Sequence, residues 1–124
     1  MKKAAINAIA KINEYDLSSN VNSFTINGML TWFDKADRVG LMNSTKILKE
    51  QGAESTSLWV NNKEITIKCD ELIDMLSKLE IYALACFDTT SSHKQNIYTL
   101  TSVEDINNYD YASGYPDKLT FTYE

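Results

Sequence analysis

A long repeat in the second half of the chain constrains the fold most strongly. Positions that step alternately by four and three residues carry, in order, Leu72, Leu76, Leu79, Ala83, Cys86, Thr90, His93, Ile97 and Leu100. This spacing places them on one face of an α-helix, which we call the seam. The poor helix formers at 88–92 oppose this helix by about 2 kcal/mol, and burying two large aliphatic side chains recovers as much. We therefore predict one helix over residues 70–100.

Such a helix is long for a chain of 124 residues. Residues 70–100 would span about 46 Å, whereas a compact chain of this size has a radius of gyration of about 14 Å. The far end therefore needs a partner, which is the N-terminal helix, the C-terminal segment or another subunit. Thr90 and His93 are polar positions within the seam, and such positions can set the partner and register of a helix.

Two β-hairpins precede the long helix. Asn27-Gly28 suits a type I′ turn between strands at 24–26 and 29–33, and the polar residues 61–63 separate strands at 56–60 and 64–68. An aspartate, Asp34 or Asp70, follows each hairpin and can cap a helix, and Gly52 suits the end of the helix expected over 35–51. An offset of 34 residues aligns the two segments apolar on apolar, which indicates a duplicated ββα unit or two unrelated segments of similar length.

The expected fold class is α+β, with both hairpins in one small antiparallel sheet packed with helices. The hydrophobic fraction of 44% fits a single domain over residues 1–124. Its expected parts are an N-terminal helix (1–15), a first ββα unit (23–52), a second (56–100), and a short helix with an aromatic docking tail (101–124). A capping box over 101–104 predicts the short helix.

Charge and hydropathy argue against two classes of partner. Twelve basic and seventeen acidic residues give a net charge of −5, and the longest basic run is Lys2-Lys3. Phosphate backbones are therefore not expected partners. The apolar stretch at 4–10 is interrupted by Asn7 and is too short for a signal peptide or a membrane span. We expect a cytoplasmic protein that binds neither nucleic acid nor membrane.

No arrangement of residues predicts chemistry. His93 and Cys86 lie about 10.5 Å apart along the predicted helix, too far for a Cys-His nucleophile. Cys69 lies about 25 Å from Cys86, so both are expected to be reduced thiols. The glycines are isolated, metal-ligand spacings are absent, and the acidic pairs fall in first helical turns. We expect a non-enzymatic protein without cofactor or metal.

The aromatic residues supply the remaining signal. Trp59 alternates with Leu58 along a strand, so one of the two leaves the buried face. The C-terminal segment gathers three tyrosines near Gly114 and the only proline. Aromatic side chains suit core packing and also wet interfaces. Our candidate interface residues are therefore His93, Ile97, Leu100, Tyr109, Tyr111, Tyr115 and Trp59, in a contact that we expect to join identical chains.

The segment 80–94 and the ending Tyr109-Asp110-Tyr111 … Gly114-Tyr115-Pro116-x-Lys118-Leu119 resemble an uncharacterised domain family of bacteriophages and prophages. Its members are encoded among virion and tail-fibre genes, often in phages of gut Bacteroidetes, and have no established activity. The resemblance implies a structural or assembly component that acts through protein–protein contacts, in the bacterial host cytoplasm or the virion. The implied partners are identical chains or other virion proteins. The alternative function is a small monomeric module that binds a glycan or a peptide through exposed aromatics.

Overall fold

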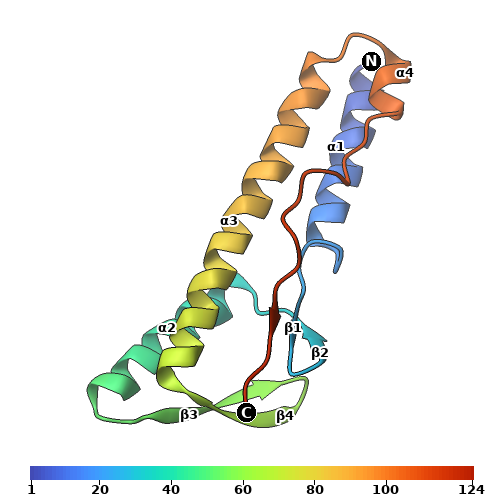
Figure 1. Cartoon of the computed structure of the whole chain (residues 1–124). Helices are drawn as coiled ribbons and strands as arrows, with labels where there is room; N and C mark the ends of the chain where they lie inside the picture. Colours follow the sequence, from blue (N-terminus) through green and yellow to red (C-terminus); the bar gives the residue numbers. More distant parts are fainter. The chain divides into compact units, whose positions relative to one another are not determined.

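The computed structural model describes all 124 residues and contains both helices and short strands (Figure 1). The fold class is α+β, as predicted. The elements in chain order are α1 (Lys2–Leu17), β1 (Phe24–Ile26), β2 (Met29–Thr31), α2 (Lys35–Glu50), β3 (Ser55–Val60), β4 (Lys63–Lys68), α3 (Cys69–Thr99), α4 (Val103–Asn107) and β5 (Thr120–Phe121).

The residue contacts divide the chain into two compact units, where the sequence analysis expected a single domain. Unit 1 comprises Met1–Asn22 and Tyr82–Asp117, and unit 2 comprises Ser23–Ile81 and Lys118–Glu124. Each unit has a hydrophobic core of its own. Helix α3 contributes residues 69–81 to unit 2 and its remaining residues to unit 1.

Unit 2 contains both predicted hairpins. Strands β1 and β2 pair in antiparallel register with Phe24 opposite Thr31, and β3 and β4 pair with Val60 opposite Lys63. The turn residues have positive φ angles, 48° at Asn27 and 78° at Gly28, as a type I′ turn requires. The second turn likewise uses two asparagines with positive φ, at positions 61 and 62.

The two hairpins do not join into one antiparallel sheet, so this part of the fold prediction was wrong. They form separate sheets with strand orders β2-β1-β5 and β3-β4. The free edge of β1 is taken by β5, which runs parallel to it with Ile26 opposite Phe121. The amide of Asn61 donates to the Leu30 carbonyl at 3.0 Å, so a side chain rather than a ladder links the two hairpins. Strand β5 falls within the predicted tail and was not recognised.

Two of the predicted helix ends in unit 2 are confirmed and one is corrected. The Asp34 carboxylate caps α2 by accepting from the Asp37 backbone N–H at 2.9 Å, and Gly52 follows α2 with a φ of 91°. Helix α3 begins at Cys69, one residue before the predicted cap. Asp70 therefore lies in the first turn, where its carboxylate pairs with the Lys49 ammonium at 2.6 Å.

The unit 2 core lies between the strands and the first three turns of α3. Its apolar side chains include four seam or near-seam residues that are completely buried, namely Leu72, Met75, Leu76 and Leu79. The facing strand residues are Ile26, Leu58, Val60 and Ile67, with Phe24 packed edge-on against Phe33 and Phe121. Helix periodicity of the apolar residues therefore predicted this core correctly.

Unit 1 is built on helices. Ile12 of α1, Ile97 of α3 and Ile106 of α4 form its buried core, with Tyr109 and Tyr111 packed against it. Helix α3 continues without interruption through residues 88–92, as the seam predicted. Ser102 caps α4 by accepting from the Asp105 backbone N–H at 3.1 Å. No helix of the protein is both long enough and apolar enough to span a membrane.

Candidate interaction surface

The segment that follows α4 lies against α1 and α3 within unit 1 (Figure 1). The ring of Tyr15, on α1, lies 5.7 Å from that of Tyr111 and 5.6 Å from that of Tyr115, measured between centroids. On α3, the hydroxyl of Thr89 donates to the Gly114 carbonyl at 3.2 Å. We call residues 109–115 the tail strap. Three partners were possible for the far end of the long helix. The structure shows two of them in contact with it, α1 and the tail strap.

His93 is held by the tail strap at both ring nitrogens. Nε2 donates to the Ser113 carbonyl at 2.8 Å, because a carbonyl can only accept. In the neutral imidazole Nδ1 is then the acceptor, and it takes the proton of the Tyr109 hydroxyl at 2.7 Å. The Tyr109 oxygen in turn accepts from the Asn96 amide at 3.0 Å. The geometry assigns His93 one tautomer and the structural role that its position in the seam suggested.

The other polar seam residue, Thr90, is also satisfied within the chain. Its hydroxyl donates to an Asp16 carboxylate oxygen at 2.8 Å and lies 2.7 Å from the Tyr115 hydroxyl. Because the Thr90 proton is used on Asp16, Tyr115 donates to Thr90. Burial raises the pKa of Tyr115, and the negative charge of Asp16 raises it further against the opposing effect of the Thr90 hydrogen bond. This network fixes α1, α3 and the tail strap together.

Tyr82 anchors the opposite end of unit 1. Its side chain is 5% exposed, and its hydroxyl donates to the Val21 carbonyl at 2.6 Å. Burial, reinforced by the neighbouring Cys86 thiol, raises the pKa of Tyr82 well above the usual range. The hydroxyl is therefore a stable donor and not a candidate acid or base at neutral pH.

These contacts place most candidate interface residues inside the chain. His93 and Ile97 are 7% and 1% exposed, and Leu100 and the three tail-strap tyrosines are half-buried. Trp59 alone is largely exposed, at 62%, on the outer face of β3. The contact of the seam and the tail strap with a second chain stays a prediction, and within the chain the tail strap itself covers the seam at His93 and Thr90.

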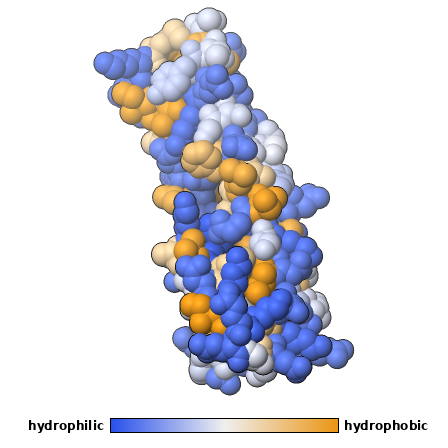
Figure 2. Space-filling model, turned by 90° about the vertical axis from the view of Figure 1, so that its left-hand side faces the viewer, coloured by the Kyte–Doolittle hydropathy of each residue, from blue (hydrophilic) through white to orange (hydrophobic).

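A surface that the sequence analysis did not identify lies on another side of α3. In unit 1, Leu84, Phe87 and Tyr98 are 56%, 67% and 74% exposed. Successive residues of a helix are rotated by about 100°, which places these three and Ser91 on one side, about 120° around the helix from the side that carries Cys86, Thr90, His93 and Ile97. We call this side the outer face of α3. Figure 2 views the side on which α3 lies in Figure 1 and shows apolar side chains breaking a hydrophilic surface.

The outer face ends beside an apolar groove of about 360 Å³ in unit 1. The groove lies between α1, the end of α3 and α4, and its wall includes Ile6, Ile97, Tyr98, Leu100 and Ile106. Ile6 is 60% exposed, so apolar surface is present on α1 as well as on α3. A signal for this surface existed in the sequence, since Leu84, Phe87, Ser91, Lys94 and Tyr98 also step by three and four. The stronger seam obscured it.

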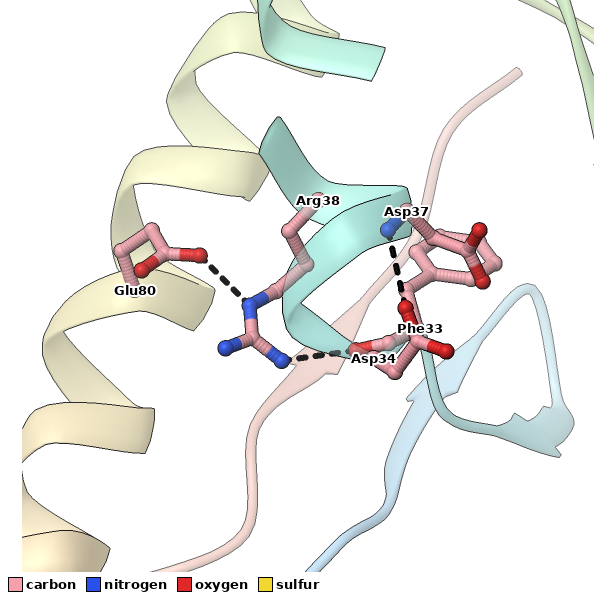
Figure 3. Close-up of polar contacts among 5 residues, drawn as sticks. All are labelled: Phe33, Asp34, Asp37, Arg38 and Glu80. Atoms are coloured by element: carbon pink, nitrogen blue, oxygen red, sulfur yellow. Dashed lines mark hydrogen bonds and ion pairs between the residues drawn. The ribbon is translucent and has the colours of Figure 1, made fainter. Parts of the chain in front are cut away.

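Unit 2 contains a buried arginine in the first turn of α2 (Figure 3). Arg38 is 6% exposed, and its guanidinium donates to the Phe33 carbonyl at 2.7 Å and pairs with the Glu80 carboxylate. It also lies 5.2 Å from the centroid of the Trp32 ring, in a cation–π contact. These interactions tie α2 to α3 and leave Trp32 half-buried. Trp32 is therefore part of the packing of unit 2 rather than of an open aromatic platform.

The groups that could carry chemistry are dispersed or buried. Cys69 and Cys86 are both free and both buried. No three His, Cys, Asp or Glu side chains are placed to hold a metal ion. Ion pairs lie in unit 2, at Arg38–Glu80, Lys49–Asp70 and Asp74–Lys78, and no buried side-chain nitrogen or oxygen lacks a hydrogen-bond partner. The contacts within unit 1 explain its buried side chains, but they do not explain the exposed apolar side chains on the outer face of α3.

Comparisons with family models, with curated proteins and with solved structures found no match to this chain.

Proposed function

We propose that this protein is non-enzymatic and acts through protein–protein contacts, as a structural or assembly component of a phage particle. The resemblance of residues 80–94 and 109–119 to phage proteins supplies the context. The observation that carries the contact role is the outer face of α3, where Leu84, Phe87 and Tyr98 are all more than half exposed.

Exposing large apolar side chains to water is unfavourable. Here it occurs on a helix whose other side already packs against a core. An ordinary surface helix has one apolar stripe, and polar residues cover its opposite side. Helix α3 has apolar residues on both sides within unit 1. Aromatic side chains that become buried on association provide most of the affinity of typical interfaces. A partner that covers Phe87 and Tyr98 explains why they are retained on the surface.

The test is the size of the native assembly in cells that carry the gene and produce particles. We expect the wild-type protein to sediment in an assembly larger than one chain and, at the particle stage, with the particles. Phe87→Glu should release it from that assembly, whereas the matched variant Val103→Glu, on α4 outside the outer face, should not. The proposal is contradicted if neither variant is released from the assembly. It is also contradicted if the wild-type protein sediments as a free chain throughout.

The second candidate function is a binding module for a glycan or a peptide, and Trp59 is the observation that favours it. Its ring is 62% exposed, and serine and threonine side chains share the outer face of the β3-β4 hairpin. Flat aromatic surfaces with nearby hydroxyl groups suit sugar rings and extended peptides. Binding on a glycan array that is lost in Trp59→Ala and kept in Phe87→Glu would favour this function over the first.

A further inference from the structure

We propose that strand β3 binds an extended peptide segment of another protein as an additional strand, with a basic side chain of that segment over Trp59. The sheet that contains β3 has two strands, so the side of β3 that faces away from β4 has no neighbouring strand. We call this side the outer edge of β3. The contact goes beyond the one proposed for the outer face of α3, because it uses unit 2 and not unit 1.

The register of the hairpin determines which backbone groups point to the outer edge. The two-residue turn makes Val60 and Lys63 a hydrogen-bonded pair, and hydrogen-bonded and non-hydrogen-bonded pairs alternate along an antiparallel ladder. The N–H and C=O groups of Ser55, Ser57 and Trp59 therefore point away from β4. All three residues are exposed, and none makes a backbone hydrogen bond to another element. Six backbone groups are thus available to an added strand.

The first hairpin shows what such an edge accepts in this protein. It has a turn of the same length, and Thr25 holds the position that corresponds to Trp59. The Thr25 N–H points away from β2 and donates to the Leu119 carbonyl at 3.1 Å, where β5 lies beside β1 (Figure 1). An extended segment from a distant part of the sequence therefore fills the edge of β1. Strand β3 is longer than β1, with six residues against three, and its occupant comes from another protein.

The two edges of the β3-β4 hairpin differ in composition. Proteins protect a free edge from strand addition with charged residues, proline or a bulge. Strand β4 carries Lys63, Glu64 and Lys68, whereas β3 reads Ser-Thr-Ser-Leu-Trp-Val, without charge or proline. The pairing is regular over six residues, so no bulge interrupts it. The outer edge of β3 has none of these three protections and suits an added strand.

The side chains beside this edge identify the chemistry of the added strand. Trp59 lies opposite Glu64 in the ladder, and Glu64 forms no ion pair within the chain. Neighbouring strands lie about 5 Å apart, so a residue added beside Trp59 is about 10 Å from Glu64 at the backbone. An arginine side chain there can cross the exposed indole ring in a cation–π contact and reach the carboxylate. The net charge of −5 also favours a basic partner.

The experiment measures binding of fluorescein-labelled seven-residue peptides to the full-length protein by fluorescence polarisation. The peptides alternate threonine and valine and carry arginine, alanine or glutamate at the central position. We expect the arginine peptide to bind at least about threefold more tightly than the alanine peptide, and the glutamate peptide to bind most weakly. Trp59→Ala and Glu64→Gln should each reduce the preference for arginine.

Two proline variants test the backbone pairing itself. Ser57→Pro removes an N–H from the outer edge of β3, and Thr66→Pro removes the corresponding N–H from the other edge of the hairpin. Neither N–H belongs to the β3-β4 ladder, so both variants should fold, which thermal unfolding verifies. We expect Ser57→Pro to raise the dissociation constant of the arginine peptide at least about fivefold. Thr66→Pro is the matched control and should leave it unchanged.

The inference is overturned if the arginine peptide does not bind at hundreds of micromolar, or if both proline variants bind it equally well. A glycan whose binding requires Trp59 but tolerates Ser57→Pro would overturn it in favour of a sugar site. A dimer of the pure protein that Ser57→Pro dissociates would overturn it in favour of a second copy. The proposed function fails separately, because its test depends on Phe87→Glu and not on the β3 edge.

Discussion

At the scale of single residues, hydrogen bonds to Tyr82 and His93 determine how unit 1 closes. Each joins a side chain of α3 to a backbone carbonyl of another segment, at Val21 and at Ser113. An intramolecular hydrogen bond contributes about 1 kcal/mol, and an acceptor that loses its buried partner costs more. Both contacts are long-range in sequence, so they stabilise the tertiary structure rather than the helix itself.

Tyr82→Phe should destabilise the protein by about 1–2 kcal/mol, because it leaves the buried Val21 carbonyl without its donor. Urea unfolding monitored by circular dichroism measures this difference. Tyr98→Phe is the matched control, since that hydroxyl belongs to a side chain that is 74% exposed. Equal stability of the two variants would show that the Tyr82 hydrogen bond contributes nothing.

His93→Ala should loosen the tail strap selectively. The change leaves the Tyr109 hydroxyl and the Ser113 carbonyl without their shared partner. We expect faster amide exchange in the tail strap and a loss of about 1–3 kcal/mol in global stability. Unchanged exchange in the tail strap would indicate that the aromatic contacts to Tyr15 hold it without the histidine.

Alkaline pH should unfold the protein through its buried tyrosines. The pKa values of Tyr82 and Tyr115 are raised in the folded state, mainly by burial, whereas unfolded tyrosines ionise near pH 10. The associated stability is therefore complete below about pH 10 and is lost as the pH rises through the folded pKa values. Ultraviolet absorbance should show these tyrosinates appearing together with unfolding. Their ionisation in a fully folded chain would contradict this assignment.

At the scale of elements, α3 shows how far periodicity can predict structure. The alternating step of four and three residues correctly predicted one continuous helix and the burial of Leu72, Leu76, Leu79 and Ile97. Short-range turn signals likewise predicted both hairpins and the cap at Asp34. These features depend on residues close together in sequence, where spacing alone carries the information.

Contacts between distant segments were not predictable in the same way. Strand β5 has two residues and pairs with β1 from the far end of the chain, so no local alternation identifies it. The position of the tail strap depends on hydrogen bonds to His93 and Thr90, and residue types alone led us to expect that this segment contacts another subunit.

The two sides of α3 should respond differently to the same substitution. Leu79→Ala removes a completely buried side chain and should cost about 2–5 kcal/mol. Leu84→Ala removes one that is 56% exposed, and it should change the stability of the single chain by less than about 1 kcal/mol. Thermal unfolding of both variants at low concentration measures the contrast. Comparable losses would mean that the outer face is packed within the chain.

At the scale of the whole molecule, two sides of helix α3 differ in what covers them. The inner side of α3 is covered by the protein's own residues in each unit. We propose that a partner covers the outer face. The chain's own contacts explain the seam, and the proposed association would bury the exposed aromatics of unit 1.

Side-chain footprinting with hydroxyl radicals tests this central claim most directly, because it reports the solvent access of individual aromatic and aliphatic side chains. The protein is labelled at a concentration that favours the monomer and again when associated. The account predicts that Phe87 and Tyr98 become protected on association while Trp59, equally accessible in the monomer, stays reactive. Continued reactivity of Phe87 in the associated state, with protection of Trp59 instead, would contradict it.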